Sequence, residues 1–266
     1  MAGASMKDIK LRIKSVESTM QITKAMELVA SSKLRKAKER QERCRPYFMG
    51  LKQTLESIET ATNDFSSPYQ QQREIKKRCL IVIAGDRGLA GGYNSNVFKS
   101  VQPMLEEGSV CVLPIGKRTV DFFARNGIEM LTTEFAEAAC VSVSDCFTIS
   151  NLITKGYLNG QYDEVAVVYT RFVSMLTQTP AHDVLLPLEK LEGKAETGVR
   201  QLVLYEPSPS AVYDAIVPNY IAGMIYGAMC ESVASELGAR RTAMDAASKN
   251  ASEMISRRPS GLRKTM

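Results

Sequence analysis

A long, uninterrupted helical pattern at the start of the chain constrains its fold more than any other feature. Residues 6–45 contain neither proline nor glycine, and their apolar side chains recur at steps of three and four, which places them on one helical face. This face comprises Ile9, Ile13, Val16, Met20, Met26, Val29 and Leu34. The pattern continues to Ile58, and only Pro46 indicates a kink. A helix of roughly 50 residues spans on the order of 75 Å, about twice the diameter of a small domain, so it must project and pack against another helix or another protein.

Composition and charge exclude several classes of protein. The chain has 266 residues, of which 44% are hydrophobic, enough for one domain of moderate size or two small ones. Its net charge of +5 is too small to require a nucleic-acid partner. The apolar runs are shorter than the roughly 18 residues that span a bilayer, and the start does not resemble a signal peptide. We therefore expect a protein that is soluble and cytosolic, or peripheral to a membrane.

The cysteines do not follow a metal-binding pattern. There are six, none in CxxC spacing, and His182 is the single histidine, so we expect buried reduced thiols and no zinc site. His182 lies between Pro180 and Pro187, and we place it on a surface loop rather than in a catalytic site.

A run of basic residues lies on the same long helix. Between residues 33 and 45, only Glu39 and Glu42 oppose seven basic side chains, which we call the basic collar. The basic collar consists of Lys33, Arg35, Lys36, Lys38, Arg40, Arg43 and Arg45. Such a run is either a solvated face or a docking surface for an acidic partner. A polar segment with a Ser67-Pro68 turn signal follows and marks a boundary.

The middle of the chain alternates between strand and helix patterns. Residues 79–85 (CLIVIAG) form a short apolar run rich in β-branched residues, which is typical of a buried parallel strand. Further strands are expected at 110–115, 165–172 and 201–205, and helices at 93–107, 118–125 and 142–158. The alternation predicts βαβ units and a small three-layer, Rossmann-like α/β domain.

The glycine-rich loop, residues 84–96, is where an enzyme would show itself. It follows a strand, precedes a helix and contains four glycines, as a phosphate cradle does. Its spacing matches neither GxxxxGK[ST] nor GxGxxG, and Lys99 lies within the following helix. We therefore favour a structural turn or a partner-facing loop, with Asp86 and Arg87 at its tip, over a nucleotide site.

A second long helix ends the chain. Ser208 or Ser210 can cap its start, and Pro218 can bend its first turns. A coiled-coil seam is indicated by Cys230, Val233, Leu237, Met244, Ala247, Ala251 and Met254. We expect the two terminal helices to pair as an antiparallel coiled coil. The predicted parts are an N-terminal helix (1–60), a central α/β domain (76–206), a C-terminal helix (208–256) and an irregular tail (257–266).

Three stretches resemble one known family, the gamma subunit of the bacterial F-type ATP synthase. They read SVESTMQITKAMELVASSKLRKAK, AGDRGLAGGYNSNV and YEPSPSAVYDAIVPNYIAGMIYGAMCESVASELGARRTAMDAASKNASEMI. The resemblance implies that the terminal helices form a rotating shaft inside a ring of alternating alpha and beta subunits. It also implies that the central domain lies beside the epsilon subunit and on the ring of c subunits.

The resemblance further implies a mechanism without chemistry in this chain. Proton flow turns the c-ring, the shaft turns with it, and the shaft drives the catalytic beta subunits through states of different nucleotide affinity. The chain would be present in one copy, without a cofactor, metal or nucleic acid. It would be peripheral on the cytoplasmic side of the cell inner membrane, reaching the membrane only through the complex.

Residues of the first helix match the family's partner-binding segment. Lys24 and Met26 match its KAM segment, where the shaft meets an acidic helix-turn-helix of beta. Lys33, Arg35 and Lys36 match the basic continuation of that segment, which favours the docking interpretation of the basic collar.

Four further residues match partner-facing positions of the family. Arg87 matches an arginine that faces the base of the ring, and Arg240 matches an arginine of the final helix. Tyr205 and Glu206 match a segment that faces the c-ring and epsilon. Ala90 departs from the cysteine that many members carry, which we expect to be harmless.

The resemblance also implies that the last helix continues past the EMI segment to an apolar tip. In this sequence, residues 256–266 contain Pro259 and Gly261, and the heptad pattern disappears. We expect a truncated tip, with weaker assembly and lower torque than a full-length member.

Two other functions are open to a chain with these patterns. An α/β enzyme using residues 84–96 would bind nucleotide, but we find no catalytic acid, base or nucleophile cluster to support it. A basic coiled-coil binder of nucleic acid would bind in a strongly salt-dependent way, but no aromatic platform accompanies the basic collar.

Overall fold

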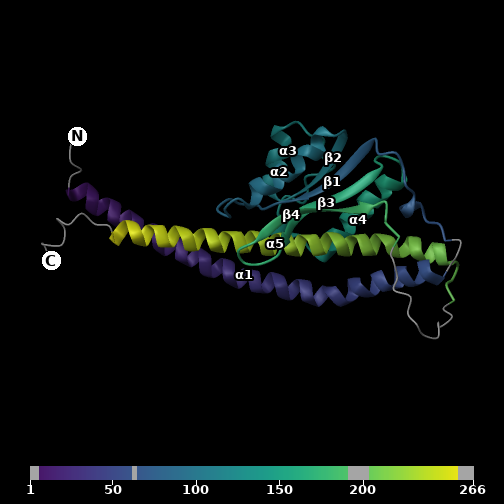
Figure 1. Ribbon diagram of the computed structural model, residues 1–266, viewed down its shortest axis with the longest axis horizontal. Coiled ribbons are helices and arrows are strands. Elements are labelled where there is room, and N and C mark those ends of the chain that lie inside the picture. The colour runs from purple at the N-terminus through teal and green to yellow at the C-terminus, as the bar shows by residue number, and fades with distance from the viewer. Residues whose placement is uncertain (1–5, 62–64, 191–203, 257–266) are drawn as a thin grey trace.

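Two long helices form the axis of the molecule. The computed structural model describes residues 6–61, 65–190 and 204–256. Helix α1 runs from Met6 to Ala61 and α5 from Pro209 to Ser256. The start of α1 and the end of α5 lie at the same end of the molecule, so the helices pair in antiparallel fashion, as predicted (Figure 1). None of the described helices is long and apolar enough to cross a membrane.

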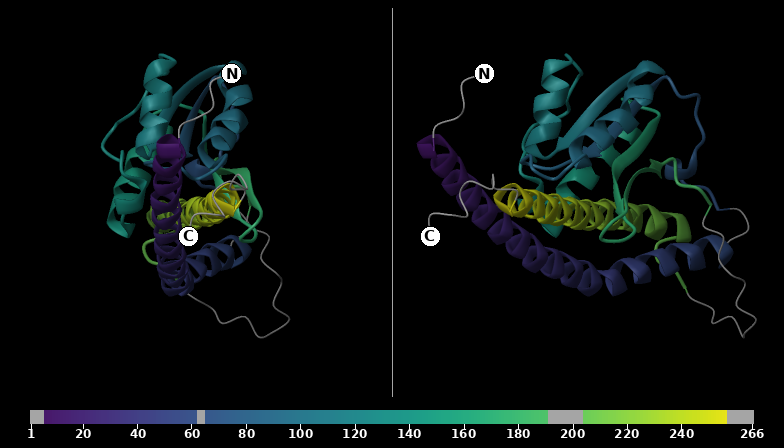
Figure 2. Two further views of the ribbon diagram at one scale, coloured as in Figure 1. Left: turned by 90° about the vertical axis from the view of Figure 1, so that its left-hand side faces the viewer. Right: turned by 60° about the vertical axis from the view of Figure 1, so that its left-hand side comes forward.

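The face of α1 that is shielded from solvent repeats every seven residues. One row consists of Ile9, Val16, Thr23, Ala30, Ala37, Cys44, Leu51 and Ile58, all buried or half-buried. A seven-residue repeat is the signature of a left-handed coiled coil. The predicted face is wrong at Val29, whose side chain is 54% exposed, because the neighbouring Ala30 occupies the seam. Pro46 does not interrupt α1, which is one helix that bows gradually along its length (Figure 2).

The predicted seam of α5 is also largely confirmed. Cys230, Leu237, Met244 and Ala251 are buried, whereas Met254 is 65% exposed and lies off the seam. Alanines let the two backbones approach closely at a small apolar cluster of the shaft, which contains Ala30, Leu34, Ala37, Ala234 and Leu237.

The ends of α5 follow the sequence signals. Ser208 caps the helix, because its Oγ accepts a hydrogen bond from the N–H of Ala211 at 3.2 Å. Pro218 lies inside α5, and its carbonyl oxygen accepts a hydrogen bond from Ser150 Oγ of α4 at 2.6 Å. Helix α5 therefore continues without a break at Pro218, and at this point it packs on the α/β domain.

The α/β domain is built on a four-stranded sheet in the order β2-β1-β3-β4. The strands are β1 (Lys77–Ile83), β2 (Ser109–Ile115), β3 (Glu164–Phe172) and β4 (Gln178–Leu186). The first three are parallel, as predicted, and β4 is antiparallel to β3.

Strand β4 corrects the placement of His182. This residue is not in a loop: it lies within β4, paired with Val168 of β3. Pro180 and the polar residues of the segment hid the strand, because proline is tolerated at a sheet edge and one face of β4 is exposed. The strand expected at 201–205 falls mostly outside the described residues, and Leu204 and Tyr205 are not in a strand.

Helices cover both faces of the sheet, so the three-layer prediction is confirmed. The helices are α2 (Tyr93–Glu106), α3 (Lys117–Arg125) and α4 (Val143–Leu158), with short 3-10 turns η1 (Pro68–Gln70) and η2 (Ala138–Cys140). In β1, Leu80 and Val82 face a core shared with α2 and α3. Cys79 and Ile81 face a larger core that α4, α5 and the end of α1 complete. The domain is thereby fused to the side of the shaft.

Candidate partner surface and glycine-rich loop

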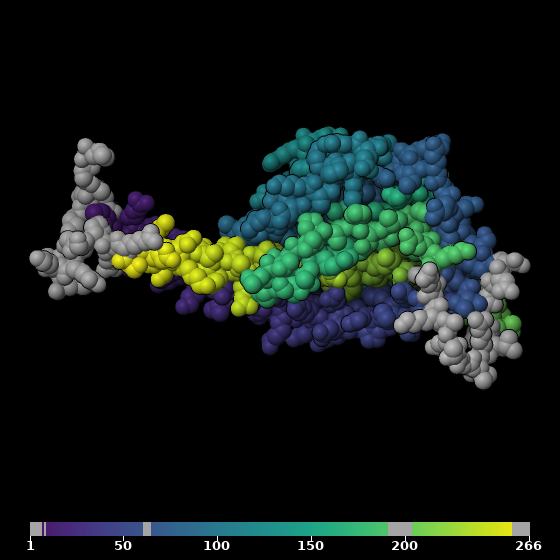
Figure 3. All heavy atoms as spheres, in the orientation of Figure 1, coloured from purple at the N-terminus to yellow at the C-terminus, as the bar shows by residue number. Residues whose placement is uncertain are grey.

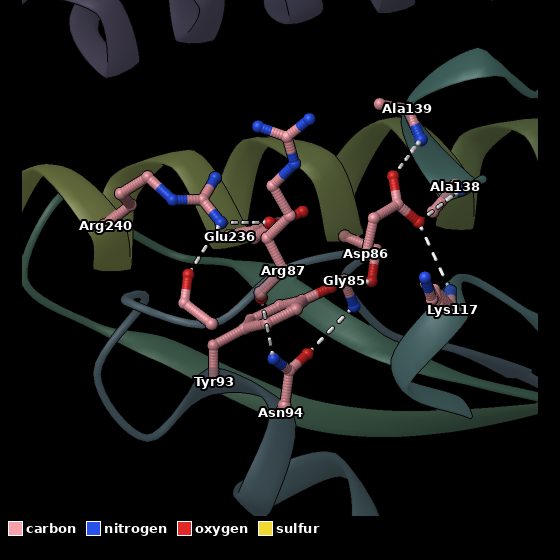
Figure 4. A network of polar contacts seen from close by, with 12 residues as sticks. Gly85, Asp86, Arg87, Tyr93, Asn94, Lys117, Ala138, Ala139, Glu236 and Arg240 are labelled. Carbon is pink, nitrogen blue, oxygen red and sulfur yellow. Dashed lines mark hydrogen bonds and ion pairs between the residues drawn. The ribbon is translucent and has the colours of Figure 1, made fainter. Parts of the chain in front are cut away.

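The glycine-rich loop between β1 and α2 is folded back on itself (Figure 4). Asn94, at the start of α2, accepts a hydrogen bond from the N–H of Gly85 at 2.9 Å and donates one to the carbonyl oxygen of Arg87 at 3.2 Å. The backbone bends tightly, with a positive φ of 63° at Leu89 and 56° at Gly91. These contacts make the loop a closed structural turn, the first of the two interpretations that the sequence favoured.

Asp86 does not point outward at the tip of the loop. Its carboxylate accepts backbone N–H hydrogen bonds from Ala138 at 2.7 Å, Ala139 at 3.3 Å and Lys117 at 3.4 Å. It therefore ties the loop to η2 and to the start of α3, and the expectation that it faces a partner is wrong. Arg87 is exposed, as expected.

The other side of the loop is fastened to α5. Arg240 donates hydrogen bonds to the carbonyl oxygen of Gly88 at 3.2 Å and to Glu236 Oε1 at 2.6 Å. A Cβ at Gly85 would lie 2.9 Å from the Glu236 carboxyl group, so a larger residue here would have to displace that carboxyl group. Sequence reasoning missed Glu236, although its spacing of four residues from Arg240 is that of a helical ion pair.

Glu236 is an unusual acid because it is buried. Its residue is 8% exposed, and this burial raises the pKa of the Glu236 carboxyl group. Arg240 and Lys33 act in the opposite direction, since their positive charges favour the ionised form. Burying the charge of either Glu236 or Arg240 without the other would therefore destabilise the folded state.

The structure places the predicted partner-binding residues in three areas: along α1, at the glycine-rich loop and just before α5. Lys24, Lys33, Arg35 and Lys36 are exposed along α1, and Met26 is half-buried.

The hydrogen bond to Gly88 brings the half-buried Arg240 next to the segment that carries Arg87 (Figure 4). The positive charge of Lys33 acts on Glu236, the ion-pair partner of Arg240. Tyr205, half-buried, and Glu206, exposed, lie apart from these residues, just before α5.

The basic collar is exposed and lightly paired. All seven of its residues are exposed. Arg35 lies 3.8 Å from Glu39, and Lys38 Nζ lies 4.3 Å from the centroid of the Phe172 ring. Exposed pairs of this kind contribute little to stability. The basic collar is therefore available to an acidic partner.

The cavity at the α2 end of the glycine-rich loop is too small for a nucleotide. The cavity lined by Tyr93, Thr170 and Gln178 has a volume of about 80 Å³, whereas ligand pockets in proteins measure roughly 300–1,000 Å³. Among the described residues, no group of three histidine, cysteine or acidic side chains is placed to hold a metal ion.

Known proteins agree with the architecture. The ATP synthase family model matches residues 5–264. The ATP synthase gamma chain of Ruminococcus albus is 44% identical, over 95% of this chain and 89% of the relative. The chain belongs to the ATP synthase gamma chain family. The sodium-ion-specific ATP synthase gamma chain of Acetobacterium woodii is also a relative, at 40% identity over 94% of this chain and 89% of its own.

Two solved structures share the fold of this chain. A chain from the central stalk and c-ring of the Tetrahymena thermophila mitochondrial ATP synthase aligns with a TM-score of 0.62 and 24% identity. The alignment covers 85% of this chain and 99% of that one. A rotor chain of the Euglena gracilis enzyme aligns with a TM-score of 0.61 and 16% identity, over 93% and 92% of the two chains. The comparisons give no support to a nucleotide-binding enzyme.

Proposed function

We propose that this chain is the central rotor stalk subunit of an ATP synthase. In this role it couples rotation of the c-ring to conformational changes at the catalytic beta subunits during ATP synthesis or hydrolysis. One observation carries the proposal. In this member of the gamma-chain family, two long helices form a continuous antiparallel shaft with an α/β domain fused to its side. A rotor needs this shape, because the shaft must reach into a ring while the domain stays outside.

The proposal assigns the chemistry to other subunits. The chain itself is non-catalytic, is present in one copy, and translocates protons only as part of the complex. The shaft helices (1–60 and 208–256) contact alpha and beta, while the central domain (76–206) contacts epsilon and the c-ring. The complex holds the chain on the cytoplasmic face of the cell inner membrane.

The proposed partner-binding residues fall into two areas. The first area binds the acidic surface of beta, because exposed positive charge steers an acidic partner. It consists of Lys24, Met26 and the basic collar residues Lys33, Arg35 and Lys36.

The remaining proposed contacts lie on and below the domain. Arg87 and Arg240 serve the base of the ring, and Tyr205 with Glu206 serves the c-ring side. Arg240 also holds the glycine-rich loop, so its substitution affects both the loop and the ring.

Co-purification with alpha and beta subunits tests the function. We expect a complex that contains a single copy of this chain, measured by native mass spectrometry. If alpha and beta assemble without it under all conditions, the rotor proposal fails. Specific nucleotide binding by the isolated chain would instead favour the enzyme alternative.

Charge reversal in the basic collar tests the docking surface. We expect the triple variant Lys33→Glu, Arg35→Glu, Lys36→Glu to weaken binding to the alpha–beta ring about tenfold or more at low salt. A matched variant reverses three exposed basic residues of the α/β domain, Lys99, Arg125 and Lys155, and should bind the ring normally. Equal losses in both triples would show that net charge, not the basic collar, governs binding.

A further inference from the structure

The turn between β3 and β4 carries several hydrogen bonds of its own. We call residues 172–178 the hairpin turn. The N–H of Ser174 donates to the carbonyl oxygen of Thr177 at 2.9 Å, and the N–H of Thr177 donates back to Ser174 Oγ at 3.1 Å. Gln178 Nε2 donates to the carbonyl oxygens of Ser174 and Met175, each at 2.9 Å. The hairpin turn therefore holds its shape through its own hydrogen bonds.

The hairpin turn crosses α5 and reaches α1 (Figure 3). On α5, Thr242 Oγ1 donates to the carbonyl oxygen of Met175 at 3.3 Å. The Phe172 ring packs on Gly238, where an added Cβ would lie 3.3 Å from ring atom Cε2. On α1, Lys38 Nζ lies over the Phe172 ring. Phe172 and Met175 also pack on the apolar cluster of the shaft. The α/β domain thus contacts both shaft helices through the aromatic ring of Phe172 and the hairpin turn.

The glycine-rich loop holds the same part of α5 from the opposite side. The loop contacts Glu236 and Arg240, whereas the hairpin turn contacts Gly238 and Thr242. At 3.6 residues per turn, residues two positions apart point about 200° apart around the helix. The two contacts therefore lie on nearly opposite sides of α5 within two turns.

Opposed contacts suit the transfer of torque. Equal and antiparallel forces applied on opposite sides of an axis form a couple, which turns a rod without pushing it sideways. Past the hairpin turn, α5 continues beside α1 and away from the α/β domain (Figure 1). The two contacts on α5 therefore lie where the shaft extends beyond the α/β domain, toward the start of α1.

We propose that the hairpin turn and the glycine-rich loop form a two-sided grip on α5 that limits twist where the shaft leaves the α/β domain, with Phe172 as its positioning residue. This inference rests on the proposed rotor function and deepens it. Phe172 contacts no partner subunit in this proposal; it acts by keeping the hairpin turn seated on Gly238 and beneath Lys38.

The test measures twist within an assembled complex. A probe is attached to the α/β domain, the alpha–beta ring is fixed to a surface, and the angular fluctuation of the stalled rotor is recorded. We expect Phe172→Ala to raise the angular variance about twofold or more, because it removes one of the two opposed contacts through which the domain and α5 are coupled. Unloaded ATP hydrolysis should stay near the normal rate, because the substitution changes no residue of the alpha–beta ring or of the two shaft helices.

Three further variants separate the grip from a general loss of structure. Phe172→Tyr keeps the ring and should restore the normal variance. Thr242→Val removes the hydroxyl that donates to the carbonyl oxygen of Met175 at 3.3 Å and, within α5, to that of Gly238 at 3.1 Å, and should raise the variance by a smaller amount. Val173→Ala, at a side chain that is 62% exposed, is the matched control and should change nothing.

The outcomes distinguish the grip from the rotor function itself. Normal variance in Phe172→Ala would overturn the inference and leave the rotor function standing. An equal rise in Val173→Ala would also overturn it, because the exposed tip would then be responsible. If the unaltered chain fails to join a rotating complex, the rotor function is what fails.

Discussion

Gly223→Ala is expected to destabilise the protein by about 2 kcal/mol, because overpacking of up to about 3 kcal/mol outweighs the roughly 1 kcal/mol by which alanine favours a helix over glycine. A Cβ at Gly223 would lie 2.1 Å from Cδ1 and 2.6 Å from Cγ of Phe48. The whole ring of Phe48 must therefore move, and it forms part of the contact between α1 and α5. Chemical denaturation followed by circular dichroism measures the change.

Gly227 offers a matched control one helical turn away. A Cβ at this position would meet nothing within 4 Å. Gly227→Ala should therefore stabilise the chain by about 0.5–1 kcal/mol through helix propensity alone. The two substitutions are chemically identical and lie in the same helix. The opposite signs of their expected effects on stability therefore come from Phe48, which lies at Gly223 and not at Gly227. A shared sign would show that Phe48 does not occupy the notch at Gly223.

Arg240→Ala is expected to cost about 3 kcal/mol, because removing one partner of a buried ion pair leaves the other charge uncompensated. The side chains of Arg240 and Glu236 are 15% and 10% exposed, so water screens the pair little. The variant also loses the hydrogen bond to Gly88 that fastens the glycine-rich loop. The same denaturation experiment measures the loss.

The effect of Arg240→Ala should depend on pH in a defined direction. Burial already raises the pKa of Glu236, and loss of the Arg240 charge raises this pKa further. The folded state then binds the Glu236 proton more tightly than the unfolded state does. Stability is therefore retained in acid and falls as pH rises from the ordinary value for glutamate through the raised pKa. The double variant Glu236→Gln, Arg240→Ala lacks the carboxylate and should not show this fall; if it does, another group is responsible.

Much of the fold is readable from local patterns. The two long helices, three of the four strands and the coiled-coil seam of α5 each follow from a periodicity within one stretch of chain. The cap at Ser208 follows equally from a local hydrogen bond. Such features are predictable because the physical cause, one buried face or one terminal donor, lies within a few residues of its effect.

Features that depend on distant residues were predicted less well. The seam of α1 passes through Thr23 and Ala30, not Val29, because small residues are needed where α5 comes close. Thr23 is even bonded across the shaft, with its Oγ1 2.7 Å from Oγ of Ser248. A search for large apolar residues does not find such positions. Strand β4 was missed for a similar reason, since an edge strand needs its neighbour β3 to be recognised.

The same division applies to the candidate site. Consecutive residues are enough to predict the long shaft, the basic collar and the glycine-rich loop. The folded structure was needed to find that Asp86 turns inward, that Glu236 and Arg240 hold the loop and that Phe172 packs on Gly238. Those contacts join residues that are far apart in the sequence; Gly88 and Arg240, for example, are separated by 152 positions. Such contacts stabilise the protein only after the domain has packed against the shaft.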